Sequence, residues 1–393
     1  MQMLGRLIFG LTYLLKIMLE AIFTKLSAYI QVALCSLSTL TCASAAVPPT
    51  QLNLTLPAGF HATVFAKLDS APRMMAFDKS GNLFVSLSKN NQVVMLPDTN
   101  KDGLSETPVL ISENLSSPNG LAFLGDELLI ANQDGVEKNK KKNGIWSKPQ
   151  PFISNLPSGG HTLKTIKLGP DNFLYINVGS SCNVCAEDDP MRATILRYTT
   201  EGKPAGALEV VGRHTTLAPI WASGLRNSQG FAWQPKTGRM FATNKGPDMR
   251  ESRKYGPPEH DLPPENFNKI EPRKHYGWPY CWVKPSNTHQ EFQDPNFVGR
   301  ENFCESATPP AITFTSHSTP IGVTFLDKSN FAAEYKNDAI VALHGSWNRV
   351  QLSGYKLVRV KFNGETPVEV VDFATGWLKD NQAWGRPVDV VVG

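Results

Sequence analysis

The sequence shows no marked excess of charge of either sign. Its 393 residues include 39 Lys and Arg against 35 Asp and Glu, a net charge of +4 that is spread along the chain. A nucleic-acid-binding surface is therefore not indicated. The chain also lacks the long amphipathic runs at helical spacing that an α/β enzyme would need. Glycine and proline are plentiful instead, with 30 and 29 residues, which favours many short strands joined by turns.

The beginning of the chain looks like an export signal. No charged residue occurs from Leu26 to Ala46, Lys25 precedes this stretch, and Ala43-Ser44-Ala45 has the small-x-small form of a signal-peptidase site. We expect residues 1–45 to be a signal peptide, which would export the remainder to the periplasm. The uncharged stretch is also long enough to cross a bilayer, so retention as an N-terminal membrane anchor is the alternative.

The cysteines indicate two disulfides. Cys35 and Cys42 lie in the leader, and Cys182, Cys185, Cys281 and Cys304 remain. An even number in an exported chain predicts the pairs 182–185 and 281–304. A redox dithiol is the alternative for the Cys-x-x-Cys pair, but no βαβ pattern surrounds it. A zinc site is disfavoured because no second Cys-x-x-Cys accompanies the first.

One pattern recurs along the chain: an apolar strand, a polar turn with Gly or Asn, and a second apolar strand. The copies are Met75–Val85, Leu121–Ile130, Ile166–Ile176, Phe231–Phe241, Val323–Leu343 and a sixth that begins at Val388–Val392. Such copies predict an all-β fold, a six-bladed β-propeller over residues 46–393, with each copy the inner hairpin of a blade. A stretch rich in Pro and charge, about 248–310, is expected to form a loop insertion on one rim.

The last blade is expected to be truncated at the C-terminus, because the sixth copy only begins before Gly393. The last sheet of a propeller is usually completed by a strand from the other terminus, and Gly59–Phe65 is the candidate here. With the middle strands missing, we expect this strand to have no neighbour to pair with.

Eight phrases, in one order over residues 55–393, together carry a family resemblance. They are Gly160–Thr162, Gly179–Cys185, Gly224–Asn227, Lys245–Asp248, Asp261–Pro264, Tyr276–Cys281, His344–Arg349 and Gly385–Asp389. With them the chain resembles the soluble quinoprotein sugar dehydrogenases, in particular the sorbosone dehydrogenase-like branch. The resemblance implies a six-bladed propeller that oxidises an aldose or aldehyde with pyrroloquinoline quinone (PQQ) and calcium. An electron acceptor, not identified by the sequence, would complete the reaction.

The resemblance assigns roles to individual residues. His161 matches the general base, and removing a hydroxyl proton while hydride leaves the same carbon suits an imidazole near neutral pKa. Gly246 and Pro247 match the pair whose carbonyls hold the cofactor's calcium, which takes oxygen ligands and acts as a Lewis acid.

Further positions match cofactor contacts: Arg226, Asn227, Arg349, Arg386, Ser181 and His317. PQQ carries three carboxylates, so converging guanidinium groups would form a suitable anion clamp. Arg349 is offset by one residue from the family's basic position, and His317 stands where a small hydroxyl residue is common.

The sequence departs from the family at Val388, Pro118 and Asn266, which replace a basic residue, a glutamine and an acidic calcium ligand. Weaker cofactor binding than in the glucose-oxidising members is therefore expected. Two other functions stay open. A calcium-dependent lactonase would need inner-strand carboxylates where this chain presents arginines, and a non-catalytic, partner-binding propeller would leave His161 unexplained.

Overall fold

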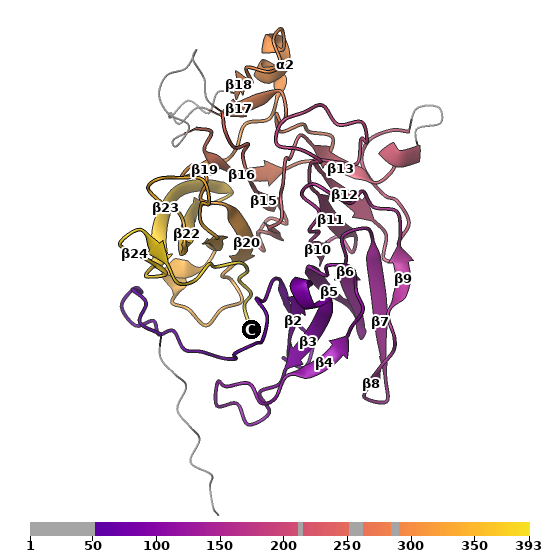
Figure 1. The fold of residues 1–393 in the computed structure, drawn as a ribbon, viewed down its shortest axis with the longest axis vertical. Coiled ribbons are helices and arrows are strands. Elements are labelled where there is room, and N and C mark those ends of the chain that lie inside the picture. Colours follow the sequence, from indigo (N-terminus) through magenta and orange to yellow (C-terminus); the bar gives the residue numbers. More distant parts are fainter. Residues whose placement is uncertain (1–51, 211–214, 251–261, 284–290) are drawn as a thin grey trace, which may run out of the picture. The chain divides into compact units, whose positions relative to one another are not determined.

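The computed structural model describes residues 52–210, 215–250, 262–283 and 291–393. Antiparallel sheets make up almost all of their regular structure (Figure 1). Helical segments in this described part are α2 (Glu301–Ser306) and the short 3-10 turns Ser88–Asn90, Thr215–Leu217 and Ala333–Tyr335. The predicted all-β class is confirmed.

Five sheets of four or five strands follow one another along the described chain. The first contains β1 (Met75–Phe77), β2 (Leu83–Leu87), β3 (Gln92–Leu96) and β4 (Val109–Ser112), and the second contains β5 (Gly120–Leu124), β6 (Glu127–Ala131), β7 (Val136–Lys142), β8 (Ile145–Trp146) and β9 (Gln150–Ile153). The third contains β10 (Ile166–Leu168), β11 (Leu174–Val178), β12 (Thr194–Tyr198) and β13 (Ile220–Ser223). The fourth contains β14 (Phe231–Trp233), β15 (Met240–Asn244), β16 (Glu265–Ile270) and β19 (Ile312–Phe314), and the fifth contains β20 (Pro320–Phe325), β21 (Ala339–Leu343), β22 (Lys356–Asn363) and β23 (Thr366–Ala374).

The recurring sequence pattern forms the first hairpin of each sheet. Met75 pairs with Val85 in the first sheet and Ile166 with Ile176 in the third, as the apolar–turn–apolar phrases predict. The second strand of each hairpin is almost entirely buried, because it has a neighbouring strand on either side and packs on both faces. The five complete copies are therefore confirmed as hairpins.

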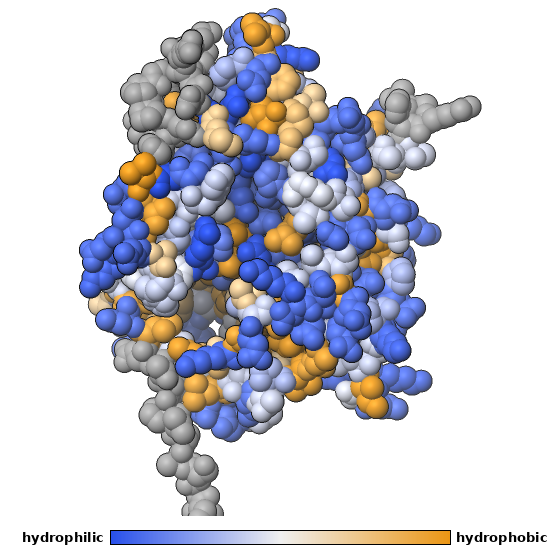
Figure 2. Space-filling view, viewed as in Figure 1, coloured by the Kyte–Doolittle hydropathy of each residue, from blue (hydrophilic) through white to orange (hydrophobic). Residues whose placement is uncertain are grey.

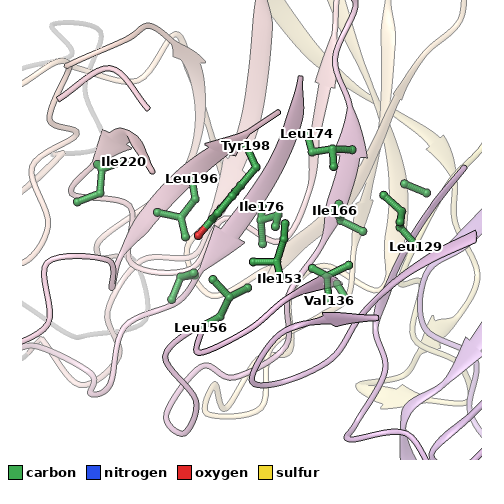
Figure 3. Close-up of a cluster of buried hydrophobic side chains, with 13 residues drawn as sticks. Leu129, Val136, Ile153, Leu156, Ile166, Leu174, Ile176, Leu196, Tyr198 and Ile220 are labelled. Carbon is green, nitrogen blue, oxygen red and sulfur yellow. The ribbon is translucent and has the colours of Figure 1, made fainter. Parts of the chain in front are cut away.

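Neighbouring sheets pack face to face in chain order (Figure 1). The largest apolar cluster joins Leu129 and Val136 of the second sheet to Ile176 and Leu196 of the third (Figure 3). Similar clusters join the first sheet to the second, the third to the fourth, and the fourth to the fifth. This succession of sheets is the packing of a propeller.

The segment at the C-terminal end lies between the fifth and first sheets but is not assigned as a strand. Val391 packs against the first sheet, whereas Val390 and Val392 pack against the fifth. The amide of Gly322 donates to the carbonyl oxygen of Val388 at 2.9 Å. Side chains that alternate between two faces are what an extended segment provides, so this segment bridges the two sheets without belonging to either.

Gly59–Phe65, the candidate strand from the other terminus, is not assigned as a strand, although Thr63 within it is a bridge residue. The segment is irregular and is attached by side-chain packing. Phe60 lies 4.7 Å from Phe331 and 5.1 Å from Phe373, measured between ring centroids. Just before it, Thr55 forms an isolated antiparallel bridge with Thr375, at the end of the fifth sheet. Aromatic packing therefore anchors this N-terminal segment to the fifth sheet.

The predicted insertion at 248–310 contains one strand of the fourth sheet, β16. Between β16 and β19 the chain adds the hairpin of β17 (Cys281–Val283) and β18 (Glu291–Gln293), followed by α2. A second small hairpin, β24 (Leu378–Lys379) with β25 (Gln382–Ala383), follows the fifth sheet. Both predicted disulfides are confirmed, Cys182–Cys185 and Cys281–Cys304.

The predicted leader, residues 1–45, lies outside the described residues. No helix within the described part of the chain is long and apolar enough to cross a membrane.

Candidate active site

The residues that the sequence analysis assigned to a site all lie in loops of two kinds. His161, Arg226, Asn227 and His317 lie between successive sheets, Arg386 lies between the fifth sheet and the C-terminal segment, and Ser181, Gly246, Pro247 and Arg349 lie between the second and third strands of a sheet. In an antiparallel meander both kinds of loop emerge at the same end of the sheets. The topology therefore brings these residues to one face.

His161 is oriented by Ser180. Its Nδ1 lies 2.8 Å from the Ser180 hydroxyl and 3.2 Å from the Ser180 carbonyl oxygen. The hydroxyl itself donates to the carbonyl of Cys182 at 2.7 Å, so Nδ1 carries the ring proton and Nε2 is left as an acceptor. Burial lowers the pKa of His161 to about 4, and the positive charges of Arg226 and Lys245 contribute. The ring is therefore neutral at pH 7.

Arg226 is buried and is held by protein atoms on several sides. Its Nε and Nη2 donate to the carbonyl and side-chain oxygens of Asn183, at 3.0 and 2.9 Å. Nη1 donates to the carbonyl of Gly246 at 2.8 Å, and Nη2 lies 3.4 Å from the carboxylate of Asp248. Most of the N–H groups are thus engaged within the protein, so Arg226 contributes mainly a fixed positive charge rather than free donors.

Lys245 lies among the other positive charges of this face. Its Nζ donates to Oε1 of Gln229 at 2.8 Å. Burial, together with the positive charges of Arg73, Arg226 and Arg386, outweighs the opposing charge of Glu265 and lowers the pKa of Lys245 to about 7. Four cationic side chains therefore act on one another in one region, an arrangement that an anion would stabilise.

A cavity of about 730 Å³ adjoins this region and is lined by residues that include Arg73, His344, Trp384 and Arg386. The space-filling view is hollowed near the C-terminal end of the chain (Figure 2), and Val388 and Asp389 of the C-terminal segment also line the cavity. Nδ1 of His344 lies 2.9 Å from the carbonyl of Pro387. Burial and the charge of Arg386 lower the pKa of His344 to about 3, so this face has a second neutral histidine.

His317 is buried and is tied to the loop of the proposed calcium carbonyls. Its Nδ1 lies 3.3 Å from the carboxylate of Asp248, which also accepts a hydrogen bond from Asn348 at 3.1 Å. Burial alone would raise the pKa of Asp248, but the hydrogen bond from His317 and the charge of Arg226 outweigh it and hold that pKa below its usual range. Asp248 therefore stays ionised and links loops of the fourth and fifth sheets.

Two expected cofactor contacts are engaged elsewhere. Arg349 donates to the carbonyls of Gln351 and Ser316, both at 3.1 Å. Ser181 is exposed, and its amide and hydroxyl both donate to Glu187 at 2.7 Å. The cationic cluster is therefore built from Arg73, Arg226, Lys245 and Arg386, rather than from all the arginines that the sequence suggested.

The residues present fit a compact polyanion such as PQQ. Besides the cations, the buried side-chain oxygen of Asn227 has no hydrogen-bond donor among the described residues. A buried polar atom without a partner is costly, so a ligand that donates to it would be favoured. The cofactor would supply that donor and would offset the charge of Lys245.

Calcium fits only as a companion of that anion. The Gly246 carbonyl already accepts a hydrogen bond from Arg226, and the nearby carboxylate of Glu265 accepts from the amides of Gly246 and Thr319 at 2.6 and 3.2 Å. Calcium needs six to eight oxygen ligands. Two loop carbonyls, Gly246 and Pro247, are too few to hold it alone, and carboxylates of the cofactor would have to complete the set.

Sequence reasoning missed Lys245, Arg73 and His344. Two of them stood inside the phrases that carried the resemblance, at the first position of Lys245–Asp248 and of His344–Arg349. Arg73 lies two residues before the first strand, in a position equivalent to the loops between sheets that hold other site residues. The signal that could have identified these residues was therefore their position in the loops beside the strands, rather than a motif.

Comparison with known proteins identifies the family of this chain. The model of the TrAA12-like family matches residues 54–377. The chain belongs to this family. An uncharacterized protein of Borreliella burgdorferi is 24% identical over 366 residues, which are 86% of this chain and 85% of that protein.

Two solved structures share the TrAA12-like fold. The iodide structure of a Trichoderma reesei protein of carbohydrate-active enzyme family AA12 has a TM-score of 0.73 at 18% identity. The holo form of the pyranose dehydrogenase PQQ domain from Coprinopsis cinerea has the same TM-score at 19% identity. Each match covers 88% of this chain and 93% of the solved one. The likeness at this identity establishes the fold.

Proposed function

We propose that this TrAA12-like protein is a PQQ- and calcium-dependent dehydrogenase that oxidises an aldose sugar or aldehyde. The observation that carries the proposal is the cluster of Arg73, Arg226, Lys245 and Arg386 on the same face as a neutral, oriented histidine. A lactonase would need carboxylates around its metal, and this cluster is cationic. Family membership and the pyranose dehydrogenase fold support the same conclusion.

The bound PQQ would supply the two-electron acceptor, taking hydride from the carbon that carries the substrate hydroxyl. His161 would take the hydroxyl proton at Nε2, because Nδ1 is committed to Ser180. Lys245, Arg73 and Arg386 would hold the cofactor's carboxylates by charge. The carbonyls of Gly246 and Pro247 would bind calcium once the cofactor is present.

We also propose that the fold is a six-bladed propeller in which residues 385–393 occupy the position of the sixth blade. The packing of Val390 to Val392 between the fifth and first sheets supports this position. Residues 1–45 would act as the export signal or as an anchor, and an external electron acceptor would reoxidise the cofactor.

The direct test is reconstitution of the purified protein with PQQ and calcium, followed by dye reduction over a panel of aldoses and aldehydes. We expect a cofactor spectrum and dye reduction with at least one substrate. The His161→Ala and His344→Ala variants, compared in the same assay, decide which neutral histidine is the base. Loss of the base should lower turnover by about 10² to 10⁴-fold with little change in PQQ affinity. Absence of both spectrum and dye reduction would refute the proposal.

A further inference from the structure

The loop closed by the Cys182–Cys185 disulfide lies beside two groups of the proposed site. The disulfide joins residues three positions apart, and both cysteines are only partly buried. The carbonyl of Cys182 accepts a hydrogen bond from the hydroxyl of Ser180, and this hydroxyl orients His161. Asn183, one of the two residues inside the loop, contacts Arg226.

Asn183 uses nearly all of its polar atoms to hold this arrangement. Its carbonyl oxygen accepts from Nε of Arg226 at 3.0 Å and from Nε1 of Trp278 at 3.1 Å. Its side-chain oxygen accepts from Nη2 of Arg226 and from the amide of Asp248, both at 2.9 Å, and its side-chain nitrogen donates to the Asp248 carbonyl at 2.7 Å. One short loop therefore fixes the edge of the guanidinium formed by Nε and Nη2, together with the backbone of Asp248 beside it.

We propose that Asn183 is a positioning residue for Arg226, and that the Cys182–Cys185 disulfide is the brace that holds Asn183 in place. The guanidinium is fixed by two oxygens of a single residue, so its orientation depends on the conformation of that residue's backbone. Opening the disulfide releases the backbone on both sides of Asn183. Arg226 then loses its fixed orientation, and the carbonyl of Gly246 loses its partner.

The consequence for the cofactor rests on the proposed function. A charge that is held in place binds an anion without an ordering cost, whereas a mobile arginine must be ordered at each binding event. An intact disulfide thus favours PQQ binding, and its removal weakens binding without removing any cationic side chain.

The first arm of the test measures Arg226 itself in the cofactor-free protein, so it does not depend on PQQ binding. Phenylglyoxal modifies accessible guanidinium groups, and peptide mapping by mass spectrometry reports the rate at Arg226. We expect protection in the wild-type protein, because Arg226 is 4% exposed. Labelling should be at least about tenfold faster in Asn183→Ala and in the double variant Cys182→Ser/Cys185→Ser.

A matched control is the double variant Cys281→Ser/Cys304→Ser, which removes the other disulfide and leaves the Asn183 loop closed. Arg226 should stay protected in it. The Asn183→Asp variant keeps the side-chain acceptor for Arg226 and should also preserve protection, which separates positioning from general loosening. Equal labelling rates in wild type and both loop variants would overturn the proposal.

The second arm is a double-mutant cycle on the dissociation constant of PQQ, followed by its absorbance in calcium buffer. Serine variants are used because PQQ reacts with thiol reductants. Asn183→Ala should weaken binding by about 10- to 100-fold, the size expected for lost hydrogen bonds to a charged group. In the Arg226→Ala background the same change should have almost no effect, because both act through one group.

Additive losses in the cycle would show that Asn183 acts independently of Arg226, which contradicts the inference. If the wild-type protein binds no PQQ, the proposed function fails, and the labelling arm alone decides the role of Asn183.

Discussion

Replacing Lys245 by methionine should make the cofactor-free protein more stable and less able to bind PQQ. The pKa of Lys245 is lowered from 10.5 to about 7, first by burial and then by neighbouring positive charge. Folding therefore disfavours the charged form. In the unfolded chain the ammonium is charged and solvated up to about pH 10.5, so the buried lysine destabilises the native state below that pH, and does so fully below its folded pKa of about 7.

The size of the effect follows from the shift. A depression from 10.5 to about 7 corresponds to about 4 kcal/mol at pH 7 by linkage. The residue as a whole keeps partial solvent exposure although its ammonium is buried, so screening reduces this to about 2 kcal/mol. For the unit spanning 49–393, with an unfolding entropy of about 2 cal/mol/K per residue, the expected rise in Tm is about 3 °C.

The pH dependence has a definite sign. Below about pH 7 the lysine is charged in both states, and the gain from Lys245→Met is complete. Between about pH 7 and 10.5 the folded lysine is already neutral, so the gain shrinks and disappears by about pH 10.5. Melting curves of wild type and variant from pH 6 to 10 measure this directly.

Lys164→Met is a matched control. Lys164 is also a buried lysine, but its ammonium donates to three carbonyls, those of Gln133, Pro157 and Thr162. Removing it leaves these acceptors without a donor and should lower the Tm. If Lys245→Met lowers the Tm as well, or raises it by an amount independent of pH, the view of Lys245 as an unbalanced charge awaiting an anion is wrong. Unchanged PQQ affinity would equally refute it.

Three further predictions concern calcium binding, the catalytic base and the Cys281–Cys304 disulfide. Calcium alone should leave the Tm of the cofactor-free protein unchanged, whereas calcium with PQQ should raise it, because the loop carbonyls of Gly246 and Pro247 are too few ligands without the cofactor; stabilisation by calcium alone in a thermal melt would contradict this. The rate of sugar oxidation should fall at acid pH as His161 is protonated, since burial lowers its pKa to about 4. Bound PQQ should move this fall toward pH 6.5, because its negative charge offsets the positive charges near His161. A rate independent of pH from 4 to 7 would exclude His161 as the base. Replacing Cys281 and Cys304 by serine should cost about 3 kcal/mol in urea unfolding, since the disulfide closes a loop of 23 positions; an unchanged midpoint shows that the hairpin and α2 hold the segment unaided.

The periodicity of the chain determined much of the fold. Apolar alternation with polar turns defined the five inner hairpins, because a strand buried on both faces needs a nearly continuous apolar sequence, and a hairpin needs a local turn. Both disulfides followed from cysteine count and compartment. These features depend on residues close in sequence, or on chemistry that leaves few alternatives.

The tertiary structure decided how the ring closes and which charges meet. Phe60 and Val391 each pack on a sheet that lies more than 250 residues away along the chain, and no local pattern specifies such partners. In the same way, Arg226 looked like a ligand-binding arginine in sequence, but in the fold its donors are occupied by Asn183 and Gly246. The charge of Lys245 acquires its altered pKa only where loops from several sheets converge, because desolvation and neighbouring charge depend on distance in space rather than along the chain.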